Sequence, residues 1–111
     1  FEDLGKGAVN IRGGEQATLT PASNVVENCH IHHFGQVSPI ANPAIDMSGV
    51  GCRAQHNLIH HFAHQGIVFI GNDHYCGFNM IHDGVMYNND AGSIYCGSYD
   101  WSRRGSVCEY N

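Results

Sequence analysis

The stretch "NLIHHFA" at residues 57–63 has two relatives in the chain, "CHIHHFG" at 29–35 and "NMIHDGV" at 79–85. Each contains isoleucine followed by histidine at the same place. The repeat extends to the end of the chain, where "EYN" puts Asn111 in the slot of the first asparagine. Self-similarity at a spacing of about 20 to 50 residues marks a repeat architecture, so the repeats decide the fold before any single motif does.

A second series of strand-like runs lies between the members of the first. Each run ends in glycine: "AVNIRG" (8–13), "AIDMSG" (44–49), "GIVFIG" (66–71) and "GSIYCG" (92–97). Two alternating strand types with a short period and variable insertions predict parallel strands stacked coil upon coil, because helical repeats are longer. The sequence therefore predicts an all-β chain, a right-handed parallel β-helix of about four to five coils. We expect residues 1–111 to be one segment of a larger β-helix domain.

Alternation along the second series predicts which side chains face the interior. Two inward columns follow from it: Val9, Ile45, Ile67 and Ser93, then Ile11, Met47, Phe69 and Tyr95. The outward positions between them begin polar, with Asn10 and Asp46, and become apolar, with Val68, Ile70 and Ile94. Exposed aliphatic residues on adjacent coils predict an apolar patch. Either a segment outside this sequence covers the patch, or the patch forms the floor of a groove beside Asp46.

Equivalent residues on adjacent coils lie about 4.8 Å apart, so side chains of the same type stack on one another. We expect the recurring asparagines to adopt left-handed backbone geometry and to pass amide hydrogen bonds along the stack. Cys76 and Cys108 fall in one column, as neighbours near enough for a disulfide. Stacked parallel side chains often miss the disulfide torsion, so we expect two free thiols that pack as small hydrophobic groups.

Histidines at 56, 60 and 64 would share one face of a helix, an arrangement typical of zinc sites. In a β-helix the spacing that matters runs between coils, and His60 instead stacks between His32 and His82. We therefore expect no metal centre and no cofactor. His64 and His74 have no partner in the repeat, which makes them candidates for donating hydrogen bonds to a sugar.

Composition excludes two classes of partner. The formal charge is −5 with a single lysine, so no cationic stripe is present to bind nucleic acid. No apolar run approaches the roughly 20 residues that span a bilayer, so no membrane partner is expected. The chain begins and ends without a polar capping element, which predicts an excerpt of a longer protein or end-to-end self-association through uncapped coils.

The chain from "NVVENCHIHHFG" through "NDHYCGFNMIHD" to "NNDAGSIYCGSYDWSRRGSVCEYN" resembles the right-handed parallel β-helix proteins of bacterial polysaccharide metabolism. The segments "NDAGSIY" and "DWSRRG" are similar to large secreted proteins grouped with glycoside hydrolase family 141. The resemblance implies a polysaccharide or oligosaccharide partner and a secreted, periplasmic or cell-surface location. It implies an enzyme that hydrolyses glycosidic bonds.

Two aspartates are the candidate catalytic pair. Asp46 lies in the middle of a predicted strand on its outward face, where aspartate is disfavoured. Asp90 opens the strand two coils further along, about 9–10 Å away along the stack. Inverting glycosidases separate their carboxyl groups by about 6.5–9.5 Å and retaining enzymes by about 5–5.5 Å, so the estimate favours inversion without deciding it. Each aspartate also has a structural alternative. Asp46 would be a solvated surface carboxylate near Arg12, and Asp90 would be a turn residue that bonds its own backbone.

The polar loop "SYDWSRR" (98–104) supplies candidate substrate-binding residues. Tyr99 and Trp101 can stack on a sugar ring, and Arg103 and Arg104 can bind a carboxylate or sulfate. Two other functions stay open. A polysaccharide lyase would need a basic residue beside a uronate, and Lys6 is the one lysine of the chain. A non-catalytic segment of an adhesin or spike would bind glycan without turnover.

Overall fold

The computed structural model of the protein describes residues 1–87, 89–97 and 100–111. Within these ranges the chain is all-β and forms the strands β1 (Val9–Gly13), β2 (Val25–Glu27), β3 (His30–Phe34), β4 (Ile45–Val50), β5 (Arg53–Gln55), β6 (Leu58–Phe62), β7 (Gln65–Asn72), β8 (Tyr75–Gly77), β9 (Met80–His82), β10 (Gly92–Tyr95) and β11 (Val107–Glu109). No helix in the part of the chain that the structure describes has the length and apolar character of a membrane span.

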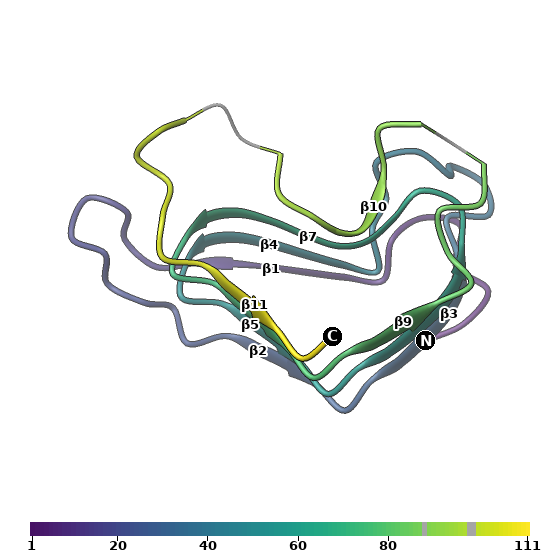
Figure 1. Ribbon diagram of the computed structural model, residues 1–111, viewed down its shortest axis with the longest axis horizontal. Coiled ribbons are helices and arrows are strands. Elements are labelled where there is room, and N and C mark those ends of the chain that lie inside the picture. The colour runs from purple at the N-terminus through teal and green to yellow at the C-terminus, as the bar shows by residue number, and fades with distance from the viewer. Residues whose placement is uncertain (88, 98–99) are drawn as a thin grey trace.

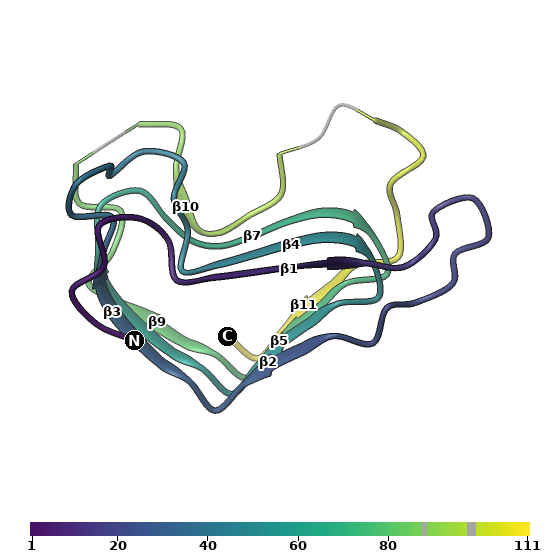
Figure 2. The ribbon, with the colours of Figure 1, turned by 180° about the vertical axis from the view of Figure 1, so that it is seen from behind.

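The strands form three parallel sheets. Sheet 1 has the order β1-β4-β7-β10, sheet 2 the order β2-β5-β8-β11, and sheet 3 the order β3-β6-β9. The chain visits sheets 1, 2 and 3 in turn and then begins again, and we call each such passage a circuit. Sheet 1 lies opposite the V made by sheets 2 and 3 (Figures 1 and 2). The prediction of an all-β chain built from parallel strands is confirmed.

Each of the first three circuits contains three strands, whereas the sequence predicted two strand types. The first repeat series is divided by a corner, so that β5 and β6 belong to different sheets. His56 lies at this corner with a φ of 56°, and its equivalents Asn28, Phe78 and Tyr110 have φ between 53° and 57°. A left-handed residue other than glycine carries no reliable sequence signal, which is why the pattern did not reveal the corner.

Stacked asparagines join the circuits directly after this corner. The Oδ1 atom of Asn57 accepts the Cys29 backbone N–H at 3.0 Å, and the Oδ1 atom of Asn79 accepts the Asn57 N–H at 3.1 Å. Asn111 repeats this contact with Asn79 at 3.1 Å. The Nδ2 atom of Asn57 donates to the Val26 carbonyl at 3.0 Å. The predicted amide ladder is confirmed, but the left-handed geometry belongs to the residue before each asparagine.

The interior is filled by residues from all three sheets, among them Ile45 and Ile67 of sheet 1, Ala54 of sheet 2 and Ile59 of sheet 3. Both inward columns were predicted wrongly at their last members, Ser93 and Tyr95. Ile94, rather than Ser93, pairs with Ile67, and Tyr95 pairs with Val68. This register packs Ile94 against the core and leaves Ser93 exposed, which buries the apolar side chain of the two.

The cysteine column is confirmed. Cys76 pairs with Ala54 on one side and with Cys108 on the other, and both cysteines are free thiols. Cys76 is buried and Cys108 is exposed. Burial raises the pKa of both thiols, and the neighbouring Cys108 adds to the effect on Cys76. These raised pKa values favour the neutral thiol, the form that packs as a small hydrophobic group.

The histidine column is confirmed as well. The ring of His60 stacks on that of His32 at a centroid distance of 4.9 Å and on that of His82 at the same distance. His61 stacks on His33 at 4.8 Å. Desolvation lowers the pKa of His60, and the surrounding imidazoles lower it further.

Candidate functional site

Asp46 lies on the outward face of β4, as its alternation predicts. Its neighbour on β1 is Asn10, whose Nδ2 atom donates to Asp46 Oδ2 at 2.9 Å. Arg12 reaches Asn10 rather than Asp46, with Nε donating to Asn10 Oδ1 at 2.9 Å. The carboxylate is therefore oriented by an amide, and its second oxygen, Oδ1, has no hydrogen bond among the described residues.

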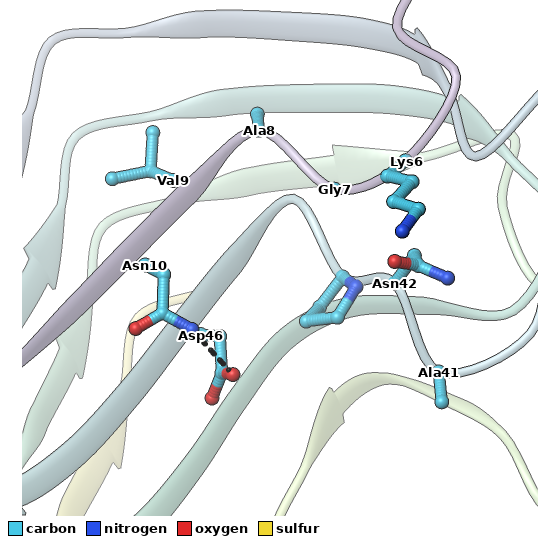
Figure 3. Close-up of a pocket in the computed structure, with 9 residues that line it drawn as sticks. Lys6, Gly7, Ala8, Val9, Asn10, Ala41, Asn42 and Asp46 are labelled. Atoms are coloured by element: carbon cyan, nitrogen blue, oxygen red, sulfur yellow. Dashed lines mark hydrogen bonds between the residues drawn. The ribbon is translucent and has the colours of Figure 1, made fainter.

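A hollow of about 340 Å³ lies beside Asp46. Its lining combines a carboxylate, two amide side chains and a cation: Lys6, Gly7, Ala8, Val9, Asn10, Ala41, Asn42, Pro43 and Asp46. Lys6 and Asn42 lie together, apart from the hydrogen-bonded pair of Asn10 and Asp46 (Figure 3). A hollow of this size accepts a small polar group such as a sugar unit.

Asp90 belongs to the segment between β9 and β10, where its φ is 53°. The Tyr95 hydroxyl donates a hydrogen bond to Asp90 Oδ1 at 2.9 Å. Asp46 pairs with Val68, and Val68 pairs with Tyr95, so Asp46 and Tyr95 occupy one outward column of sheet 1. Two strand spacings separate them, or about 10 Å between Cα atoms. The structure thus links both aspartates to one face of sheet 1.

The outward apolar residues beside Asp46 are Val68 and Ile70, both partly exposed. Ile94, expected in the same patch, faces the core instead, and Tyr95 takes its place. The face beside Asp46 therefore presents two aliphatic side chains and a tyrosine. An aromatic ring next to a carboxylate suits the apolar face of a sugar ring better than a third aliphatic residue would.

His74 lies inside the protein, with 1% of its surface exposed. Its Nδ1 atom accepts the Cys52 backbone N–H at 3.2 Å, and its Nε2–H donates to the Ile70 carbonyl at 3.2 Å. Both ring nitrogens are therefore engaged by backbone groups. Burial lowers the pKa of His74, so the fold holds the neutral ring. This arrangement gives His74 a structural role and leaves no nitrogen for a sugar.

His74 makes stability depend on pH. Its folded-state pKa lies below the unfolded value of about 6.5, so the unfolded chain binds more protons as the pH falls through that value. We expect the free energy of unfolding contributed by this residue to be intact above about pH 6.5 and to fall below it, by at most about 1.4 kcal/mol per pH unit. Urea unfolding between about pH 8 and pH 5 measures the slope.

The variant His74→Gln retains a donor and an acceptor without a titrating ring, and it should flatten that slope. His56→Gln, an exposed position on another corner, serves as the matched control and should keep the wild-type slope. Equal slopes in wild type and His74→Gln would show that the ring does not couple protonation to folding.

His64 is also buried, with 8% of its surface exposed, and its Nδ1 atom has no hydrogen-bond partner among the described residues. It lies in the turn between β6 and β7. Like His74, it does not line the hollow beside Asp46. The two unmatched histidines are therefore not part of that hollow, although His64 directly precedes Gln65, which pairs with Gly92 near Asp90.

Trp101 and Arg104 meet at a different hollow, of about 340 Å³, near the corner between sheets 1 and 2. Trp101 is 92% exposed. Arg103 is half-buried, and its Nε atom lies 3.8 Å from Asp100 Oδ2. The backbone N–H of Ser102 lowers the pKa of Asp100, and the Ser102 hydroxyl adds to this. Tyr99 lies outside the described residues.

The site contains residues that the sequence did not single out. Lys6 and Asn42 come from loops, which the strand repeats do not describe. Asn10 shares a column with Asp46, so its role was readable from the repeat. Tyr95 was assigned to the interior, and only the corrected register places it outward.

No group of three or more histidine, cysteine, aspartate or glutamate side chains within residues 1–87, 89–97 and 100–111 is arranged to hold a metal ion. No known protein family, curated protein or solved structure matches the chain.

Proposed function

We propose that the three sheets are part of a right-handed parallel β-helix belonging to a secreted or cell-surface protein that degrades glycans. The parallel pairing in all three sheets, the cyclic order of strands and the asparagine ladder support this architecture. The resemblance to the bacterial β-helix proteins and to glycoside hydrolase family 141 supports the substrate class. The outward face of sheet 1 is the proposed substrate-binding surface.

The proposed reaction is hydrolysis of a glycosidic bond by Asp46 and Asp90. The observation that carries it is the link between both carboxylates and one outward column of sheet 1, through Asn10 and Tyr95. One carboxylic acid protonates the leaving oxygen, and the other carboxylate activates a water molecule or attacks the anomeric carbon. Inverting enzymes separate their two carboxyl groups by about 6.5–9.5 Å and retaining enzymes by about 5–5.5 Å, so the stereochemistry of the product reports the separation of Asp46 and Asp90.

The proposed substrate is an oligosaccharide lying across sheet 1. Its hydroxyl groups would meet Asn10, Asn42 and Lys6 in the hollow beside Asp46. Its apolar ring faces would lie against Val68 and Tyr95 on the neighbouring strands. Sugars present polar edges and apolar faces, and this surface offers both kinds of contact.

Lys6 favours a second candidate function. It lines the same hollow as Asp46, and a lysine beside a carboxylate-bearing site can act as the base of a uronate lyase. Elimination leaves an unsaturated sugar that absorbs ultraviolet light, whereas hydrolysis produces only a new reducing end. The two reactions are therefore separated by the product.

We expect the protein to release reducing ends from one member of a panel of labelled oligosaccharides, and Asp46→Asn and Asp90→Asn each to abolish that release. The change replaces an acid or base by an amide that can neither give nor take the proton. Asp73→Asn is the matched control, because Asp73 is an exposed aspartate that lines a different hollow, and it should keep full turnover.

Three outcomes contradict hydrolysis by Asp46 and Asp90. Turnover that survives both substitutions would remove the aspartates from the mechanism. An unsaturated product lost in Lys6→Gln would establish the lyase instead. Oligosaccharide binding without product, unchanged in both aspartate variants, would establish a binding segment.

A further inference from the structure

On sheet 3, three pairs of residues that are neighbours in sequence are stacked on successive strands. His32 pairs with His60 between β3 and β6, and His60 pairs with His82 between β6 and β9. The residue after each is His33, His61 and Asp83 respectively. We call these the donor pairs, because each contains two side chains that can donate a lone pair to a metal ion.

The two side chains of each donor pair converge. The Nδ1 atoms of His32 and His33 are 2.8 Å apart, and those of His60 and His61 are 2.6 Å apart. In the third pair, His82 Nδ1 lies 2.9 Å from an Asp83 carboxylate oxygen. All three circuits therefore bring the same kind of atoms together.

Left-handed backbone geometry produces this convergence. Successive side chains of a regular strand point to opposite faces, so neighbours in sequence do not normally meet. The second member of each donor pair instead has a positive φ: 51° at His33, 53° at His61 and 47° at Asp83. Such a conformation costs a residue with a Cβ about 1–2 kcal/mol, and the fold adopts it at the same place in three circuits.

Ring stacking alone does not account for the third pair. His33 and His61 stack on each other at 4.8 Å, but Asp83 has no ring to continue the column. What all three circuits keep is a nitrogen beside a second nitrogen or a carboxylate oxygen. Imidazole nitrogen and carboxylate oxygen are both ligands of zinc. The second members His33, His61 and Asp83 are exposed, so an ion has direct access.

We propose that the donor pairs of sheet 3 bind a divalent ion of the zinc class, held by both side chains of one pair and completed by water. Each such site has two protein ligands. The described residues contain no larger site, with three or more histidine, cysteine, aspartate or glutamate side chains placed to hold a metal ion. Tetrahedral zinc with bonds of about 2.0–2.1 Å separates two nitrogen ligands by about 3.3 Å, so each pair opens by roughly 0.5 Å as the ion replaces the shared proton. A rotation of the exposed second ring supplies that opening.

The proposal is independent of the glycan site, which lies on sheet 1. It also differs from a helical zinc motif, because the ligands are neighbours in sequence rather than four residues apart. His30 lies close by, with its Nε2 atom 2.8 Å from that of His60, and Glu2 Oε2 lies 3.5 Å from His32 Nε2. These contacts orient the rings of His32 and His60 and leave their Nδ1 atoms directed at the second member of each pair.

The test is a titration of the full chain with Zn²⁺, followed by calorimetry and by the imidazole ¹⁵N resonances. We expect binding with the Nδ1 resonances of His60 and His61 shifted. The triple variant His33→Gly/His61→Gly/Asp83→Gly removes one ligand from all three donor pairs at positions whose positive φ suits glycine, so the fold is retained. Its affinity should fall by about tenfold or more.

Two controls define the result. His56→Gly removes an exposed histidine at another positive-φ corner and should bind Zn²⁺ like the wild type. His33→Asp/His61→Asp converts both pairs to the composition of His82 and Asp83, and should retain most of the affinity. A dissociation constant weaker than about 1 mM, unmoved Nδ1 resonances, or equal affinity in the triple glycine variant and His56→Gly would each overturn the proposal.

Discussion

Replacing Asn57 with alanine is expected to lower the free energy of unfolding by about 3–6 kcal/mol. Asn57 is 2% exposed, and its amide bonds the buried Val26 carbonyl and Asn79 Oδ1 atom and the partly buried Cys29 N–H. Alanine removes all three hydrogen bonds and offers no substitute. A buried polar group without a partner costs about 1–3 kcal/mol, so the loss of three hydrogen bonds accounts for the expected range.

Urea unfolding of Asn57→Ala against wild type measures the loss. Asn24→Ala is the matched control, because among the described residues the Asn24 side-chain amide makes a single hydrogen bond, to the Arg12 carbonyl at 3.1 Å, on a partly exposed segment. That variant should lose about 1 kcal/mol or less. If the two substitutions cost the same, the ladder does not stabilise the stack beyond an ordinary surface hydrogen bond.

Gly49→Ala is expected to destabilise the protein by about 3–5 kcal/mol or to prevent folding. Gly49 ends the glycine-terminated run of β4 with a φ of 98°, which a residue with a Cβ rarely adopts. An added Cβ would collide with the Gly13 carbonyl oxygen on the neighbouring strand. The obstacle is backbone, so relief requires β1 and β4 to separate where they are paired.

Thermal or urea unfolding of Gly49→Ala checks this expectation. Gly92→Ala is the control within the same sheet, since its added Cβ would come no nearer than 3.2 Å to any other residue, at the Ile94 carbonyl oxygen, and its φ is not positive. We expect that control to change stability by about 1 kcal/mol or less. A Gly49→Ala protein as stable as Gly92→Ala would mean that the strand ends adjust freely at this corner.

The sequence predicted the stacking of circuits well, because chemically similar residues recur at the stacked positions. The offsets that align Val26 with Ala54 and Ala54 with Cys76 are those of the structure. The last strand of sheet 1 was aligned through its terminal glycine, Gly97, which placed Ser93 inside. Burial of Ile94 outweighs that match, and a register shift of one residue reverses every side chain.

The candidate site was predictable only in part. Asp46 could be placed outward because a strand alternates with period two, whatever its neighbours are. Lys6 could not be assigned to the hollow beside it, since the path of a loop has no repeat to follow. His74 was predicted to donate hydrogen bonds to a sugar because it lacked a repeat partner. Its actual partners are backbone groups, and a hydrogen bond to the backbone does not depend on which residue type is the partner, so the sequence pattern does not reveal it.

The asparagine ladder also defines the smallest unit in which this protein can change length. Asn57 and Asn79 are 22 residues apart, and the segment between them visits sheets 3, 1 and 2 once before the amide contact recurs. If one such segment is duplicated or deleted, the chain is rejoined at equivalent positions of the ladder, so the strand register and the asparagine contacts continue. A single-residue insertion inside a strand instead turns its side chains over. Descent by whole-segment duplication, with free variation confined to the loops, is the evolutionary route that this geometry permits.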